Sequence, residues 1–263
     1  LGNTGLAGQT IAEVYEANGA SAIWSNVIKY VGAGAIATGG VISLLKSLPL
    51  IIKTFAGAMK SLKNTSGGTN VRTDRDLKMP VVLGIILIVI ILIWLVPSVP
   101  VSLLGAFLIA IFGFFFATVS SRMVGLIGSS NNPVSGMAIA TLLISTFVLK
   151  ATGNTGMAGM TGAIAIGSII CVIAAIAGDT SQDLKTGFIV GATPAKQQVG
   201  ELIGVVASGF AIAGVMSLLN KAWGFGSAEI PAPQATLMKM IVEGIMDAKL
   251  PWADRPLAQR QWQ

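Results

Sequence analysis

Long apolar runs, rather than alternating apolar and polar positions, dominate this chain. Residues 81–96 read VVLGIILIVIILIWLV, whereas a strand of a membrane barrel would alternate. A helix that crosses a bilayer needs about 20 mostly apolar residues. Six stretches are predicted as spans on this basis: 24–46, 80–96, 99–119, 134–150, 155–177 and 199–219. The pattern therefore predicts an all-α fold, a polytopic integral membrane helix bundle within residues 24–219.

The region after residue 219 has a different pattern. Residues 234–249 have one apolar face and a polar remainder, which is typical of an amphipathic helix on the bundle or at the membrane interface. The apolar face holds Ala235, Met238, Ile241, Val242, Ile245 and Met246, and the charged residues are Lys239, Glu243, Asp247 and Lys249. We expect residues 220–263 to hold this helix and an irregular tail.

Both ends of the sequence indicate a fragment of a longer protein. The chain starts at Leu1, without the basic flank and cleavage site of a signal peptide. Residues 1–23 are expected to form a glycine-rich segment that is extracytoplasmic or re-entrant. Residues 253–263 are polar and irregular, where a further span would be expected.

Positive charge is concentrated in the loop at residues 53–78. Lys and Arg in short loops mark the cytoplasmic side, so we expect this loop to be cytoplasmic, in a multi-pass protein of the inner (plasma) membrane. Counting spans from it places Arg122 and residues 179–196 on the same side. Nucleic-acid binding explains the loop less well, because Gly67 and Gly68 lie in a flexible polar linker. The basic residues are Lys53, Lys60, Lys63, Arg72, Arg75 and Lys78.

Composition argues against several classes of function. Charged residues make up 11% of the chain, whereas soluble domains have about a quarter. There is no histidine, and the single cysteine, Cys171, lies inside an apolar span. Neither a histidine-based active site nor a thiolate zinc site is therefore expected. No GxxxxGK[ST] phosphate loop occurs, so we expect no ATP hydrolysis, no enzyme activity, no cofactor and no resident metal.

A polar segment at residues 129–137, SSNNPVSGM, comes directly before a predicted span. Asn132 is a candidate N-cap and Pro133 a candidate first helical residue. If this helix start lies inside the bundle, its free amides and positive dipole end would favour an anionic group. If it lies at the surface, Asn132 is an ordinary cap.

Two further polar segments contain carboxylates. Asp179 and Asp183 are four residues apart in GDTSQDLKTG at 178–187, so they share a face if the stretch is helical. Such a pair can share a proton or coordinate a cation, or it can cap a helix and pair with Lys185. Glu201 enters the sixth predicted span, where an ionisable group is a functional candidate. It can equally favour the helix N-terminus electrostatically.

These motifs also carry a family resemblance. The runs GDTSQDLKTGFIVGATPAKQQ at 178–198, SSNNPVSGM at 129–137 and SLLKSLP at 43–49 resemble the oligopeptide transporter (OPT) family, in its prokaryotic branch. The similarity extends from about Trp24 to Trp252. Similar sequences commonly have an arginine after the proline of the ATP run, whereas this chain has Ala195, so a basic contact there is not expected.

The resemblance implies a secondary transporter that couples protons to the uptake of small peptides or metal–chelator complexes. Proton-coupling candidates are Asp179 and Glu201. A rival hypothesis is a channel-like or structural membrane subunit, because glycine-rich helices also build pores. A homo-oligomer stays open, since small-residue stripes serve internal and intersubunit packing alike. The candidates for lining the substrate pathway are Asn131, Asn132, Asp179, Gln182, Asp183 and Lys185.

Overall fold

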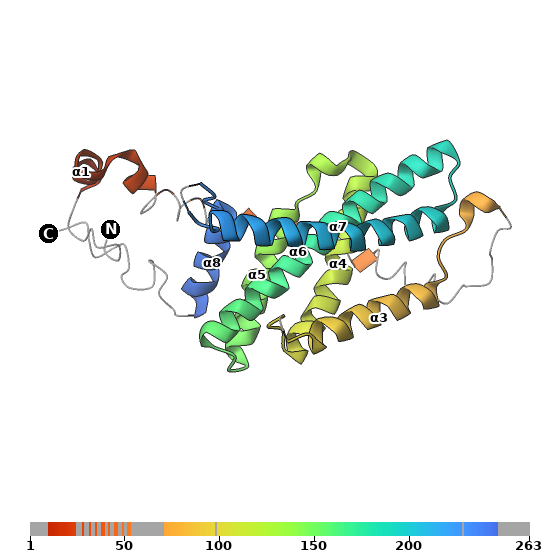
Figure 1. Ribbon diagram of the computed structural model, residues 1–263, viewed down its shortest axis with the longest axis horizontal. Helices are drawn as coiled ribbons and strands as arrows, with labels where there is room; N and C mark the ends of the chain where they lie inside the picture. Colours follow the sequence, from red (N-terminus) through yellow and green to blue (C-terminus); the bar gives the residue numbers. More distant parts are fainter. Residues whose placement is uncertain are drawn as a thin grey trace.

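The described part of the chain is entirely helical apart from turns and loops. The computed structural model describes residues 10–24, 71–97, 99–227 and 229–246, with isolated positions between 28 and 53, and without the side chains of Asn131 and Pro233. Its helices are α1 (Ile11–Ile23), η2 (Arg72–Asp74), α3 (Met79–Leu95), α4 (Leu103–Ile127), η3 (Ser129–Asn131), α5 (Val134–Ala151), α6 (Gly156–Val190), α7 (Pro194–Ala222) and α8 (Pro233–Met246). No strand occurs among these residues (Figure 1).

Five of the described helices are long and apolar enough to cross a membrane: α3, α4, α5, α6 and α7. The expected all-α, polytopic membrane bundle is therefore confirmed. The span predicted at residues 24–46 lies largely outside the described residues, as do residues 1–9 and the tail after Met246. The rest of the predicted glycine-rich segment is described and forms the helix α1.

The centre of the bundle is the contact between α4 and α6. Along it Gly105 meets Ile166, Gly113 meets Ile173 and, farther on, α4 meets Ser181. The residue numbers rise together, so the two helices run parallel. Helix α5, which lies between them in the sequence, runs in the opposite direction and packs on α6. The buried core contains Ala106, Ile109, Phe116 and Val119 from α4, Met137, Leu142 and Leu149 from α5, and Ala163, Ile166, Ile170 and Ala174 from α6.

Helix α8 covers the other side of this core. Its buried residues are Leu237, Ile241, Val242, Ile245 and Met246, packed on α5 and α6. The Lys150 ammonium donates to the Ile245 carbonyl oxygen at 2.6 Å, so a cation satisfies a carbonyl near the end of α8. The predicted apolar face is correct except that Leu237 is buried and Ala235 is exposed.

Helices α3 and α7 differ from the other predicted spans because neither has a buried residue. Figure 1 shows α3 and α7 as long helices extending beyond the central contact. Both are strongly apolar, and in water such surfaces would be very unfavourable. Their exposed faces are suited to lipid or to further membrane helices.

Two predicted boundaries are wrong. Helix α4 begins at Leu103 and continues to Ile127, so residues 99–102 form a turn and Arg122 is helical. Helix α6 continues to Val190, well beyond the predicted span at 155–177, so residues 179–190 are helical. No proline interrupts this stretch, and Gly178 and Gly187 are buried at close contacts. At 35 residues α6 is about 52 Å long, well beyond the roughly 30 Å hydrocarbon core.

Gly167 gives a direct test of the packing between α5 and α6. A Cβ there would lie 2.6 Å from Leu142 Cγ, so Gly167→Ala forces a buried side chain to move. We expect a loss of about 1–3 kcal/mol, seen as a lower midpoint of thermal unfolding of the purified protein. Gly204→Ala on α7 is the matched control, because nothing lies within 4 Å of its new Cβ. Equal midpoints for both variants would contradict this packing.

Candidate functional site at the basic end of the bundle

The polar motifs meet at one end of the bundle, which we call the basic end: residues 71–78, 128–133 and 191–194. The other end, formed by residues 96–102 and 152–155, is called the opposite end. Figure 1 places η2 and the turn between α6 and α7 at the same side of the molecule. Since α4 and α6 both run toward the basic end, the segments that follow them, η3 and the α6–α7 turn, start there.

Asn132 links three helices rather than capping one. Its Nδ2 donates to Ser120 Oγ at 2.7 Å and to the Ala174 carbonyl oxygen at 3.2 Å. Ser120 also donates to the Ala174 carbonyl. The predicted cap is wrong: Pro133 occupies the N-cap position of α5, without a side-chain cap, and Val134 is the first helical residue. The Asn132 side chain instead joins the segment after η3 to α4 and α6.

The missing side chain at Gly178 lets the motif at residues 129–137 pack against the motif at residues 178–187. A Cβ at Gly178 would lie 2.7 Å from Asn132 Nδ2 and 3.1 Å from Ser120 Oγ, so the absence of a side chain makes room for the amide. Asn132 Oδ1 is buried and has no hydrogen-bond partner among the described residues. A buried amide oxygen without a partner is unfavourable, and it is available to a donor from a ligand or from another segment.

The carboxylates of the second motif lie on the extended part of α6. Because this stretch is helical, Asp179 and Asp183 do lie one turn apart, and both are exposed, as are Gln182 and Lys185. The Lys185 ammonium lies 6.0 Å from the centre of the Phe188 ring. Helix α6 ends at Gly191, whose φ of 73° is in the left-handed region and suits a glycine.

Glu201 faces α6 from the second turn of α7. Its carboxyl group interacts with the Thr180 side chain and with the negative charge of Asp183. Glu201 Oε1 is buried and has no hydrogen-bond partner in the described part of the chain. Because α7 begins at Pro194 and has no acidic residue in its first turn, the interpretation of Glu201 as a helix N-terminal charge is wrong.

Sequence reasoning missed the clamp, which we define as the contacts between residues 71–77 and 191–198. Arg72 donates to Thr193 Oγ1 and to the Gly191 carbonyl oxygen, each at 2.8 Å. The Ala195 amide donates to the Arg75 carbonyl oxygen at 2.8 Å. These residues are about 120 positions apart in the chain, so no local pattern could have revealed the pairing.

Gln198 completes the clamp from the first turns of α7. Its Oε1 accepts from the Leu77 amide at 2.9 Å, and its Nε2 donates to Asp76 Oδ1 at 3.1 Å. The neighbouring Gln197 donates to the Asp183 carbonyl oxygen at 2.6 Å and packs against Gly187. Gln198 thus holds α7 to residues 76–77, and Gln197 holds it to α6.

Comparison with known proteins agrees with these motifs. Residues 6–254 match the family model described as OPT oligopeptide transporter protein. The chain belongs to the OPT family. This OPT chain is also 33% identical to a Haemophilus influenzae protein named "Putative oligopeptide transporter", over 89% of the chain and 42% of that protein.

A second relative is more distant. A Saccharomyces cerevisiae protein named "Putative oligopeptide transporter YGL114W" is 29% identical over 52% of this OPT chain and 19% of its own length. The chain thus spans less than half of either curated relative. No solved structure matches it. Family membership and the apolar helices together identify a multi-pass membrane protein.

The backbone contact within the clamp predicts a specific cross-link. Arg75→Cys combined with Ala195→Cys, in a Cys171→Ala background, keeps the hydrogen bond between the Ala195 amide and the Arg75 carbonyl, because both groups are in the backbone. We expect a short thiol-reactive cross-linker to join most molecules, detected as a shift in gel mobility. The control pair Arg75→Cys with Gly204→Cys places the second thiol about 13 Å further along α7. Equal cross-linking of both pairs would contradict the clamp.

Proposed function

We propose that the protein containing this chain is a secondary active transporter that couples a proton gradient to the uptake of short peptides across the plasma membrane. Membership of the OPT family and the names of the two relatives support peptides as the substrate class. Metal–chelator complexes are the other substrate class to test. Driving uptake with a proton gradient requires a group that binds a proton in one state of the transporter and releases it in another.

The proton-coupling part of the proposal rests on the environment of the Glu201 carboxyl group. One of its carboxyl oxygens is buried without a hydrogen-bond partner among the described residues, and its carboxyl group interacts with the like-charged Asp183 carboxylate on α6. Proton uptake by Glu201 on α7 removes its repulsion with the Asp183 carboxylate on α6, and proton loss restores that repulsion. A proton thereby changes the preferred spacing of two helices, which is what coupling requires.

The charged surroundings of Glu201 are mixed. Its carboxyl group interacts with the like-charged Asp183 carboxylate and with the Thr180 hydroxyl. Asp179 remains the second coupling candidate, although its exposure makes it a weaker one. The other charged residues on the elements that meet here are Lys185 on α6, Lys196 on α7, and Arg72, Asp74, Arg75, Asp76 and Lys78 before α3.

The chemistry of the remaining candidates suits the two ends of a peptide. The exposed carboxylates Asp179 and Asp183 are one turn apart and would attract a peptide ammonium group. Lys185 would attract its carboxylate, and Gln182 would bond to its amides. The unpartnered Asn132 Oδ1 accepts a hydrogen bond from an N–H donor. Asn131, the last residue of η3, comes directly before Asn132 and is the remaining candidate for the proposed pathway.

Replacing Glu201 by glutamine tests the coupling. In proteoliposomes containing the full-length protein, we expect Glu201→Gln to lower uptake driven by a pH gradient by about tenfold, within the usual range of coupling energies. Exchange of labelled for unlabelled peptide at equal pH should continue, because it needs no net proton movement. The readout is the ratio of gradient-driven uptake to exchange.

Glu243→Gln is the matched control for this experiment. Glu243 lies on α8, where it pairs with Lys239 at 3.5 Å on the surface, so its removal should leave both rates unchanged. Gradient-driven uptake that persists in Glu201→Gln would eliminate Glu201 as the coupling group. Peptide flux in the wild type that neither saturates nor responds to pH would favour a channel instead.

A second substitution tests the proposed ammonium contact. Asp179→Asn and Asp183→Asn should each raise the KM for a free peptide by about two- to fivefold, a small effect because exposed charges are screened by solvent. N-acetylated peptides lack the ammonium group, so their KM should not change. Glu229→Gln, in the segment between α7 and α8, is the control. Unchanged KM values for free peptides would remove both aspartates from the pathway.

A further inference from the structure

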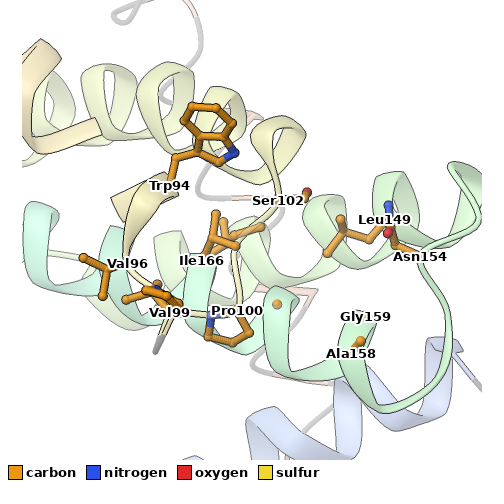
Figure 2. A pocket seen from close by; sticks show the side chains of 13 residues that line it. Trp94, Val96, Val99, Pro100, Ser102, Leu149, Asn154, Ala158, Gly159 and Ile166 are labelled. Atoms are coloured by element: carbon orange, nitrogen blue, oxygen red, sulfur yellow. The ribbon is translucent and has the colours of Figure 1, made fainter. Parts of the chain in front are cut away.

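A pocket lies at the opposite end of the bundle, away from every candidate considered so far. It has a volume of about 370 Å³, within the range of small-molecule sites in proteins. Figure 2 shows it between the turn that joins α3 to α4 and the turn that joins α5 to α6. Three transmembrane helices, α3, α5 and α6, and the turn before α4 thus contribute to one hollow.

The walls of the pocket are predominantly apolar. Trp94 and Val96 from the end of α3 form one side, together with the ring of Pro100 (Figure 2). Leu149 and Ile166 form the inner side, and their side chains are almost fully buried. An apolar group that enters this space leaves water and contacts an aromatic ring, a proline ring and two aliphatic side chains.

Polar groups in the lining come from the two turns. Ser102 caps α4 by accepting from the Gly105 amide at 3.2 Å, which leaves the hydroxyl proton of Ser102 able to donate. Asn154 donates to Thr152 Oγ1 at 3.2 Å through Nδ2, and its side-chain oxygen can accept. A ligand with an apolar group beside amide groups matches this combination better than a hydrocarbon chain does.

The pocket is closed toward the centre of the bundle. Beyond Ile166, the α4–α6 contact is filled by Phe116 and Ile170, with exposures of 1% and 0%. Gly113 brings the helices close together at this level, since its Cβ would meet Ile173 at 3.2 Å. Within the described residues the hollow is therefore a dead end, which suits a binding pocket and not the mouth of a pore.

We propose that this pocket binds one apolar side chain, of the size of leucine or phenylalanine, from a peptide substrate. The inference rests on the proposed peptide transport and adds a specificity site to it. The basic end is expected to face the cytoplasm, so the pocket opens on the side from which an imported peptide arrives. The peptide backbone then lies beside Ser102 and Asn154, and the side chain points toward Ile166.

Ala158 allows the pocket to be filled without disturbing the core. It lines the pocket at the first turns of α6 and is itself exposed. We expect Ala158→Trp in the full-length protein to weaken binding of radiolabelled trileucine by about tenfold or more, with Ala158→Leu intermediate. Trialanine, which has no large side chain to place, should bind to all three proteins alike. Equilibrium binding is measured on the purified protein, and uptake in proteoliposomes.

Met157→Trp is the matched control, because Met157 adjoins Ala158 but does not line the pocket and is 76% exposed. Selective loss of trileucine binding in Ala158→Trp supports the pocket, whether or not the wild type transports peptide. Absence of peptide uptake by the wild type would instead contradict the proposed function alone. Equal trileucine binding by all variants, as when a lipid chain fills the hollow, overturns the inference, and so does equal weakening for trialanine.

Discussion

The close approach of α4 and α6 is the constraint on which the rest of the described structure depends. In a bilayer the lipid tails are as apolar as the side chains, so the hydrophobic effect does not drive helices together. They associate through packing and hydrogen bonds instead. Gly105, Gly113 and Gly178 remove the side chains that would hold the two backbones apart. The Ser120 hydroxyl can then reach the Ala174 carbonyl oxygen across the contact. Packing and polar contact are thus achieved by the same small residues.

This contact also determines where the polar motifs meet. Helices α4 and α6 run parallel, so the end of α4 and the second half of α6 lie side by side, with Ser181 donating to the Ser121 carbonyl at 2.7 Å. The η3 segment follows α4 directly and lies over Gly178, where Asn132 enters. Helix α6 then continues beyond the bilayer thickness and returns as α7. Two motifs about 50 residues apart therefore share one end of the bundle.

Local patterns in the sequence were sufficient for the helices and insufficient for their contacts. The apolar runs predicted α3 and α5 closely, because helix length in a membrane follows from hydrophobic length. Helix α7 begins at Pro194, earlier than the predicted start at residue 199. The apolar runs ended α6 too early, since residues 179–186 are mostly polar but helical. Contacts with α7 hold this stretch, such as the hydrogen bond from Gln197 to the Asp183 carbonyl oxygen. Glu201 was found as a charge in an apolar segment. Its neighbour Thr180 and the Arg72 clamp depend on long-range pairing, which no periodicity encodes.

The two ends of the described bundle have opposite chemical character. At the basic end, Arg72 and Gln198 tie a loop to the α6–α7 turn, and carboxylates lie on an extended hairpin. At the opposite end, proline-rich and glycine-rich turns enclose an apolar hollow. Between them the α4–α6 contact is tightly packed, so no route through it joins the two ends. Outside this contact, α3 and α7 keep exposed apolar faces, and in the proposed coupling α7 is the helix whose position a proton on Glu201 would change.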